Sequence, residues 1–258
     1  MDSSKIEEVG MKVELDRVSF SYGGVTVLDH FAAQFPSGEV TVLLGPSGCG
    51  KTTILNLLAG LLIPREGTVR VGDRSPLEVR VGYIFQDVRL IPWLTVRRNL
   101  DLVLPRTIPL TERMYRIQTV LRLVGLEHAL GLFPDQLSGG MYRRVGMARA
   151  YLFEPDLYLM DESFQGLDPP LKFQLLSNFQ QLRSTSPKTT VFVTHDIEEA
   201  LLLGDEIHLL SPLPARIVHS LRNPVSLEDR IPGNHELARL EGELFSLFRK
   251  ETMHLGKE

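Results

Sequence analysis

Residues 38–58 contain the feature that most constrains how this chain can fold. Val40 to Leu44 form a short apolar run that predicts a buried strand. The next six residues, GPSGCG at 45–50, contain three glycines, which favour a loop that tolerates positive φ and close approach by a ligand. Residues 51–58 then have the length and apolar spacing of a helix. A strand, a glycine loop and a helix in this order predict an α/β fold.

The same stretch fits the phosphate-binding pattern G-x-x-x-x-G-K-[ST]. Backbone N–H groups of such a loop point into one concavity, and the helix N-terminus adds positive potential there. That terminus contributes only about 0.3–1 kcal/mol per charge, so a triphosphate needs more. Lys51 supplies a full positive charge for the β- and γ-phosphates, and Thr52 offers a hydroxyl to Mg²⁺. The alternative, a glycine-rich turn that fits by accident, is disfavoured by its place between a strand and a helix.

These residues predict a site for ATP and Mg²⁺. The residues assigned to nucleotide binding in this stretch are Gly45, Pro46, Ser47, Gly48, Cys49, Gly50, Lys51, Thr52 and Thr53. Cys49, the only cysteine, has two interpretations. It is a small filler of the loop, or Lys51 and the helix N-terminus make it a reactive thiolate whose alkylation blocks hydrolysis unless ATP protects it.

Another strand, predicted at residues 157–160, leads into Asp161 and Glu162. Buried carboxylates are costly unless they are paired or bind a metal. Asp161 suits Mg²⁺ held together with Thr52. Glu162 is then expected to point toward the γ-phosphate and to polarise the attacking water. The alternative is a strand that simply ends at solvent.

Two further predicted strands end beside polar side chains. Gln86 follows the strand at 79–85, and ligands bind at the carboxyl ends of parallel strands. Its amide oxygen could reach Mg²⁺ or the attacking water, although alone it would be an ordinary surface residue. His195 follows the strand at 190–194 and could donate a hydrogen bond to the γ-phosphate. A lone histidine there would otherwise be a turn residue with its hydrogen bonds satisfied.

The regions on either side of the glycine loop differ in predicted secondary structure. The pattern of residues 11–35 predicts strands joined by a glycine turn. Tyr22, in this region, is either an aromatic residue of the core or a ring on which adenine stacks. Residues 87–150 predict a helical insertion. Trp93, the only tryptophan, belongs either to the core or to an apolar patch that another protein covers.

The motif Leu137-Ser138-Gly139-Gly140 precedes a predicted helix. Ser138 is a natural N-cap, and two glycines let a phosphate approach the exposed N–H groups. Alone, the motif would be a capped helix start and nothing more. Beyond it, the pattern predicts helices and strands in alternation and a closing amphipathic helix. The predicted ranges are 171–182, 190–194, 197–203, 205–210, 216–219 and 237–248.

Bulk composition excludes several classes of protein. The 258 residues include 43% hydrophobic and 23% charged residues, which is ordinary for a soluble globular protein. A net charge of −4 gives no reason to expect nucleic acid as a partner. No apolar run approaches the ~20 residues that a membrane span needs. The polar N-terminus, MDSSKIEEVG, shows no secretory signal, and one cysteine suits a reducing compartment, so we expect a cytoplasmic protein.

Taken together, the motifs resemble the ATP-binding subunit of an ABC transporter over nearly the whole chain. GPSGCGKTT at 45–53 resembles Walker A, LYLMDE at 157–162 resembles Walker B, and LSGGM at 137–141 resembles the family signature. The remaining matches are Gln86 to the Q-loop, Asp168 to the D-loop, His195 to the switch histidine and Tyr22 to the adenine-stacking aromatic. FQDVRLIPWLTVRRNL at 85–100 further resembles importers of the nitrate, sulfonate and taurine type.

The resemblance implies a fold and a division of the chain. The fold is a P-loop NTPase (RecA-like) α/β core with an antiparallel β subdomain and an inserted α-helical subdomain. The nucleotide-binding domain would span residues 11–220, with the helical insertion at about 87–150. Residues 221–258 would form a C-terminal helical extension.

The resemblance also implies a mechanism and partners. Two copies, or one copy and a similar ATPase subunit, would bind two ATPs head to tail, each between Lys51 of one subunit and Ser138 to Gly140 of the other. Glu162, His195 and Gln86 would be catalytic, and Thr52, Gln86 and Asp161 would hold Mg²⁺. Transmembrane permease subunits and a solute-binding protein would complete an importer for a small, anionic or sulfonate-like solute. The subunit would lie peripherally at the cytoplasmic face of the inner or plasma membrane.

Several residues depart from the family pattern. Ser163 stands where a proline usually follows the catalytic glutamate, Gln165-Gly166 replaces a usual small pair, and Arg143 replaces a common glutamine. None of these departures removes a group that the chemistry requires. They do not show how fast ATP is turned over or how the D-loop is coupled to hydrolysis. Two alternatives remain at this point: a non-transport ABC ATPase that clamps nucleic acid or a ribosome, and a nucleotide-gated binding subunit with little hydrolysis.

Overall fold

The computed structural model describes residues 10–253, with side chains described as far as residue 250. Residues 1–9, which supply most of the polar N-terminus, lie outside the described residues. Residues 254–258 of the expected C-terminal extension lie outside them as well. Within the described range, no helix combines the length and the apolar character that crossing a membrane requires.

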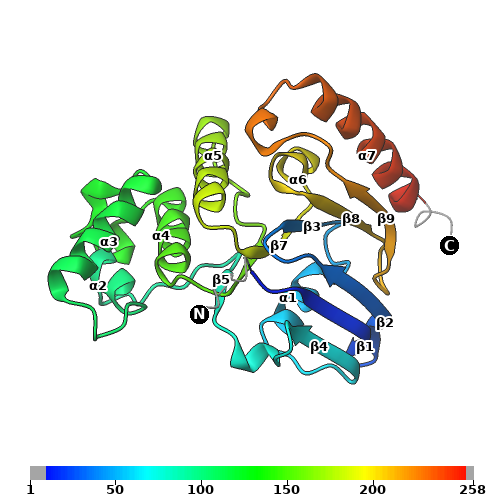
Figure 1. Cartoon of the computed structure of the whole chain (residues 1–258), viewed down its shortest axis with the longest axis horizontal. Helices are drawn as coiled ribbons and strands as arrows, with labels where there is room; N and C mark the ends of the chain where they lie inside the picture. Colours follow the sequence, from blue (N-terminus) through cyan, green and yellow to red (C-terminus); the bar gives the residue numbers. More distant parts are fainter. Residues whose placement is uncertain (1–9, 254–258) are drawn as a thin grey trace, which may run out of the picture.

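A six-stranded sheet forms the centre of the molecule, with strand order β5-β6-β7-β3-β8-β9 (Figure 1). Its strands are β3 (Val40–Leu44), β5 (Val81–Ile84), β6 (Leu157–Asp161), β7 (Thr189–Thr194), β8 (Glu206–Leu210) and β9 (Ile217–Arg222). All neighbours pair in parallel except β9, which is antiparallel to β8. Every residue of β3, β6 and β7 is buried, as expected for a parallel sheet covered on both faces. The carboxyl ends of these strands therefore meet at one edge of the sheet.

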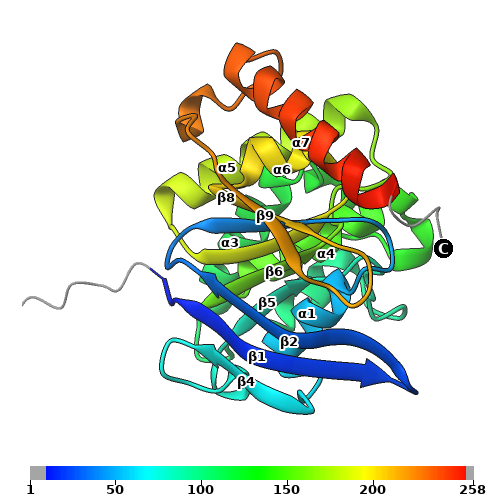
Figure 2. The same cartoon turned by 90° about the vertical axis from the view of Figure 1, so that its right-hand side faces the viewer.

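A smaller antiparallel sheet lies below the central one (Figure 2), with strand order β2-β1-β4. Its strands are β1 (Val13–Tyr22), β2 (Val25–Phe35) and β4 (Glu66–Val71). Helix α1 (Lys51–Leu58) lies between the two sheets, and its Ile54, Leu55 and Leu58 share one core with strands of both. This packing holds the helix that follows the glycine loop against the central sheet.

Helices cover the other face of the central sheet and extend beyond its β5 edge (Figure 1). Those that cover the sheet are α5 (Pro169–Thr185), α6 (Ile197–Leu203) and α7 (His235–Met253). The protruding helices are α2 (Val96–Asp101), α3 (Leu110–Leu123) and α4 (Gly139–Leu152). Short 3₁₀ turns occupy residues 76–78, 127–129, 134–136 and 227–229. One apolar cluster joins all these helices, so the protruding group is packed onto the core.

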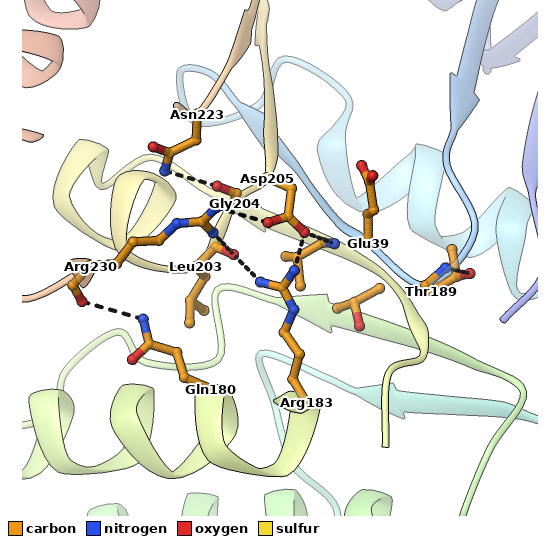
Figure 3. Close-up of polar contacts among 12 residues, drawn as sticks. Glu39, Gln180, Arg183, Thr189, Leu203, Gly204, Asp205, Asn223 and Arg230 are labelled. Carbon is orange, nitrogen blue, oxygen red and sulfur yellow. Dashed lines mark hydrogen bonds and ion pairs between the residues drawn. The ribbon is translucent and has the colours of Figure 1, made fainter. Parts of the chain in front are cut away.

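A buried carboxylate attaches the C-terminal segment to the core (Figure 3). Asp205, immediately before β8, accepts hydrogen bonds from the Val40 backbone N–H at 2.9 Å and from Arg230 at 2.9 Å. Arg183 of α5 also donates to this carboxylate. Both arginines donate to the Leu203 carbonyl as well, at 3.1 and 3.3 Å. Asp205 therefore connects α5, the central sheet and the segment that leads into α7.

The expected fold class is confirmed: an α/β core, an antiparallel sheet and inserted helices are all present. Several element bounds differ from those predicted, including β5, which spans 81–84 where 79–85 was predicted. The closing helix begins at His235, because the Asn234 side chain accepts from the backbone N–H of Glu236 at 2.9 Å. Helix α5 begins at the prolines, as the sequence predicts, with Asp168 as its cap, but it continues to Thr185, beyond the predicted end at 182. Strand β9 extends to Arg222, which pairs with Glu206 of β8.

Candidate functional site

The glycine loop connects the buried end of β3 to the first turn of α1. Gly50 adopts φ +104 and a Cβ there would lie 2.8 Å from the Val27 side chain, so both conformation and space require glycine. Lys51 is 5% exposed, and its Nζ donates to the backbone carbonyls of Gly45 and Pro46 at 2.9 Å each. The ammonium group is therefore held inside the loop, beside the backbone N–H groups at the start of α1.

A carboxylate and a hydroxyl meet beside this ammonium. Asp161 ends β6, is 4% exposed and accepts a hydrogen bond from Thr52. Burial raises the pKa of the Asp161 carboxyl, while the Thr52 hydroxyl and the Lys51 charge act in the opposite direction. Hydroxyl and carboxylate oxygens are ligands that suit Mg²⁺, so the residues present here fit this ion.

Glu162 occupies the position where the carboxyl ends of the strands converge. Its backbone has φ +42, a left-handed conformation that is uncommon for a residue with a side chain and that concentrates at functional sites. Its Oε1 lies 3.8 Å from Lys51 Nζ and 3.4 Å from His195 Nδ1. Its Oε2 accepts from Gln86 Nε2 at 3.3 Å. The structure thus brings together four residues that the sequence placed on separate strands and loops.

Lys51, Gln86 and Glu162 border one open cavity of about 430 Å³, whereas His195 and Asp161 do not line it. The lining residues are Tyr22, Val25, Val27, Ser47, Gly48, Gly50, Lys51, Thr52, Thr53, Gln86, Glu162 and Leu213. Tyr22 is 50% exposed at the end of β1, so it is not a core residue, and its ring borders the cavity. The cavity combines an aromatic ring, a cationic glycine loop and a carboxylate, which suits a nucleotide with its phosphates on the loop.

The turn Ser138–Gly140 does not border this cavity. Ser138 caps α4, because its Oγ accepts from the Met141 backbone N–H at 3.2 Å. Ser138 and Gly139 are exposed. Within one chain, this second candidate anion site therefore stands apart from the first.

Cys49 is not a reactive thiolate, contrary to one of the two interpretations above. It is 2% exposed and fills the space beside Gly45, where a Cβ would come within 2.9 Å of its sulfur. Burial raises the pKa of the Cys49 thiol, and the nearby Lys51 charge opposes this only in part. The alternative, a small side chain that fills the loop from behind, is the one that fits.

We therefore expect slow alkylation of Cys49 in the folded protein. At pH 8, iodoacetamide should modify the native chain at least about tenfold more slowly than the urea-unfolded chain, because both thiolate content and access are reduced. Mass spectrometry reads the reaction directly, since the chain has one cysteine. Equal rates in the two states, together with protection by ATP, would restore the reactive-thiolate interpretation.

Three residues at the site were not predicted from the sequence. Tyr83 of β5 donates a hydrogen bond to Asn56 Oδ1 at 3.2 Å, and burial, together with the nearby Asp161 charge, raises the pKa of its hydroxyl. Gln165 contacts Gln86. Lys172 of α5 lies 2.6 Å from the Asp196 carboxylate, next to His195, and so braces the loop that carries the histidine. Alternation along β5 could have indicated Tyr83, whereas the other two depend on loop paths that leave no periodic pattern.

A larger cavity of about 600 Å³ lies elsewhere, between α3, the end of α4 and α5. Its lining includes Tyr115, Tyr151, Gln174 and Asn178 but no residue of the glycine loop. Tyr151 Oη is buried there without a hydrogen-bond partner among the described residues. This cavity lacks the phosphate-binding groups of the first, so it is not the candidate site.

Comparison with known proteins agrees with this geometry. Residues 28–165 match the family described as "ABC transporter". The taurine import ATP-binding protein of Chromobacterium violaceum is 40% identical over 238 residues, which cover 90% of this chain and 91% of that protein. The matched range of the family contains the glycine loop, Gln86, Ser138 and Glu162.

Solved structures have the same architecture. A dimeric bacterial ABC transporter cassette superposes with a TM-score of 0.74 and 29% identity, over 83% of this chain and 100% of that one. A dimeric post-hydrolysis state of the same cassette, bound to ADP and Pi, gives a TM-score of 0.73 at 29% identity, with the same coverage.

Proposed function

Because this chain belongs to the ABC transporter family, we propose that it energises the import of a small, anionic or sulfonate-like solute. It is an ABC-type ATP hydrolase coupled to transport, as its import-type relatives and the cassette structures indicate. The sulfonate class is supported by the taurine import relative, since taurine is itself a small sulfonate. The observation that carries the proposal is the meeting of Lys51, Gln86 and Glu162 around one cavity.

Each residue at the cavity then has a role. Tyr22 stacks on adenine, and Lys51 binds the β- and γ-phosphates with the N–H groups of the loop. Glu162 accepts the proton of the attacking water, while Gln86 and His195 hold its carboxylate by the contacts described above. Thr52, Asp161 and Gln86 would hold Mg²⁺, which when bound neutralises charge on the phosphate oxygens.

The turn Ser138–Gly140 takes the ATP of a second subunit. In a head-to-tail dimer, each ATP lies between Lys51 of one copy and this turn of the other. An exposed, glycine-rich helix start outside the cavity of its own chain supports this arrangement. ATP favours the closed dimer because only there does it contact both surfaces. Hydrolysis removes that preference, and opening follows.

Transmembrane permease subunits receive this motion at the surface formed by residues 86–99. Trp93 is 75% exposed there and borders a hollow that also contains Arg98 and Phe133. Exposed Trp and Arg are enriched at binding hot spots, which favours the patch over the core interpretation of Trp93. A solute-binding protein and a peripheral position at the cytoplasmic face of the membrane complete the proposal. Residues 11–220 would form the nucleotide-binding domain.

The two alternatives from the sequence are less well supported. A protein that clamps nucleic acid is expected to be basic, whereas this chain has a net charge of −4. A binding subunit with little hydrolysis would need a defective site, but Lys51, Asp161, Glu162 and His195 are all present and close together.

Replacing Lys51 with alanine tests the nucleotide site. Hydrogen bonds to charged groups are worth about 1.5–3 kcal/mol each, so ATP should bind about 10- to 150-fold more weakly. A fluorescent ATP analogue measures this change directly. Lys12→Ala, at an exposed lysine of the short stretch before β1, is the matched control and should bind normally. Binding within about twofold of wild type in Lys51→Ala would exclude the proposed phosphate contact.

A further inference from the structure

Three residues that depart from the family pattern lie together in the structure. Arg143, in the second turn of α4, donates to the backbone carbonyl of Gln165. Its guanidinium also lies 3.3 Å from where a Cβ on Gly166 would stand, and Gly166 has φ +72. A side chain at 166 would be strained and would crowd the guanidinium. Arg143 and Gly166 are therefore matched to one another, although they are distant in sequence.

The third residue, Gln165, contacts Gln86, which in turn contacts the carboxylate of Glu162. Gln165 Oε1 accepts from Gln86 Nε2 at 3.2 Å, and the same nitrogen donates to Glu162 Oε2 at 3.3 Å. A glutamine amide donates only through nitrogen and accepts only through oxygen. The two acceptors, Glu162 Oε2 and Gln165 Oε1, therefore both favour one orientation of the Gln86 amide, in which the nitrogen faces them and the carbonyl oxygen points away from Glu162.

We propose that Gln165 is a positioning residue that fixes the Gln86 amide against Glu162, and that Arg143 holds Gln165 in place from α4. The inference rests on the proposed roles of Glu162 and Gln86. Without Gln165, Gln86 Nε2 keeps the Glu162 carboxylate as its single acceptor, so one hydrogen bond in place of two holds the amide against Glu162. The same series of contacts connects α4, the helix that Ser138 caps, to the Glu162 carboxylate within one protomer.

A double-mutant cycle in ATP turnover tests the link between Gln165 and Gln86. Gln165→Met has a similar length but no acceptor, and it should lower kcat about 2- to 10-fold, the value of one neutral hydrogen bond, with KM for ATP unchanged. In a Gln86→Met background the same substitution should have no further effect, because Gln165 acts through Gln86. Gln181→Met, at an exposed glutamine of α5, is the control and should turn over normally.

Substitutions of Arg143 test whether this residue holds Gln165 in place. Arg143→Met should lower kcat in the same direction as Gln165→Met, and the two should not be additive. Arg143→Lys keeps a donor for the Gln165 carbonyl and should recover most of the loss. A purely structural role would instead lower the thermal midpoint or nucleotide affinity, which are measured in parallel. If Gln165→Met fails to fold, Gln165→Leu replaces it.

The outcomes separate this inference from the function on which it rests. Additive effects of Gln165→Met and Gln86→Met, or unchanged kcat in Gln165→Met, overturn the positioning role. If Glu162→Gln retains full hydrolysis, the proposed role of Glu162 fails instead. A non-additive cycle, together with rescue by Arg143→Lys, supports the inference.

Discussion

Replacing Glu162 with glutamine should reduce ATP hydrolysis about 10²- to 10⁴-fold and leave ATP binding intact. The substitution keeps the shape of the side chain but removes the group that accepts a proton from water. Lys51 and His195, at 3.8 and 3.4 Å from Glu162 Oε1, hold the carboxylate in place and are unchanged by the substitution. Because the phosphate-binding loop is also unchanged, the loss should appear in kcat rather than in affinity.

The same variant should accumulate an ATP-bound dimer, since the step that opens it is blocked. Release of phosphate measures hydrolysis. Size-exclusion chromatography with light scattering, with and without ATP, measures the dimer. Glu127→Gln is the control and should behave as wild type, because this exposed glutamate lies in the 3₁₀ turn at 127–129 and does not line the cavity. Full hydrolysis in Glu162→Gln would refute the assigned role.

Local patterns account for the parts of the fold that could be predicted from the sequence. The unit from Val40 to Leu58 depends on neighbours in the chain: an apolar run, three glycines in six residues and a helix-forming stretch. The strand ends at Gln86, Asp161 and His195 followed from the same reasoning, because parallel strands bring their carboxyl ends to one edge. The structure accordingly places these residues around one cavity or in contact with Glu162.

Contacts between distant segments account for what could not be predicted. Tyr83 approaches Asp161 only because β5 and β6 pair in parallel. Gln165 approaches Gln86 through the path of a loop, which has no periodicity. The reactive interpretation of Cys49 considered the charge of Lys51 but not the burial of the thiol, and burial is the larger influence on its pKa. Sequence patterns describe which face of an element is apolar, but not the depth at which one side chain lies.

The C-terminal segment provides the largest expected effect on stability. Arg230 is 5% exposed, and burial lowers the pKa of the Arg183 guanidinium although the Asp205 carboxylate acts in the opposite direction. Both arginines therefore lie largely out of water and depend on one carboxylate for compensation. Asp205→Asn keeps the shape of the side chain but leaves two buried cations without a counter-charge.

We expect Asp205→Asn to lower the free energy of unfolding by about 3–5 kcal/mol, the cost of breaking a buried ion pair from one side. Urea denaturation measures this change, and hydrogen exchange should show earlier opening at residues 223–250, because Arg230 ties that segment to the core. Asp156→Asn is the matched control, since Asp156 pairs with Arg80 at a similar 3.2 Å but the arginine is 60% exposed. That substitution should cost under about 1 kcal/mol, as exposed pairs do. Equal losses in the two variants would show that burial is not what makes the Asp205 cluster important.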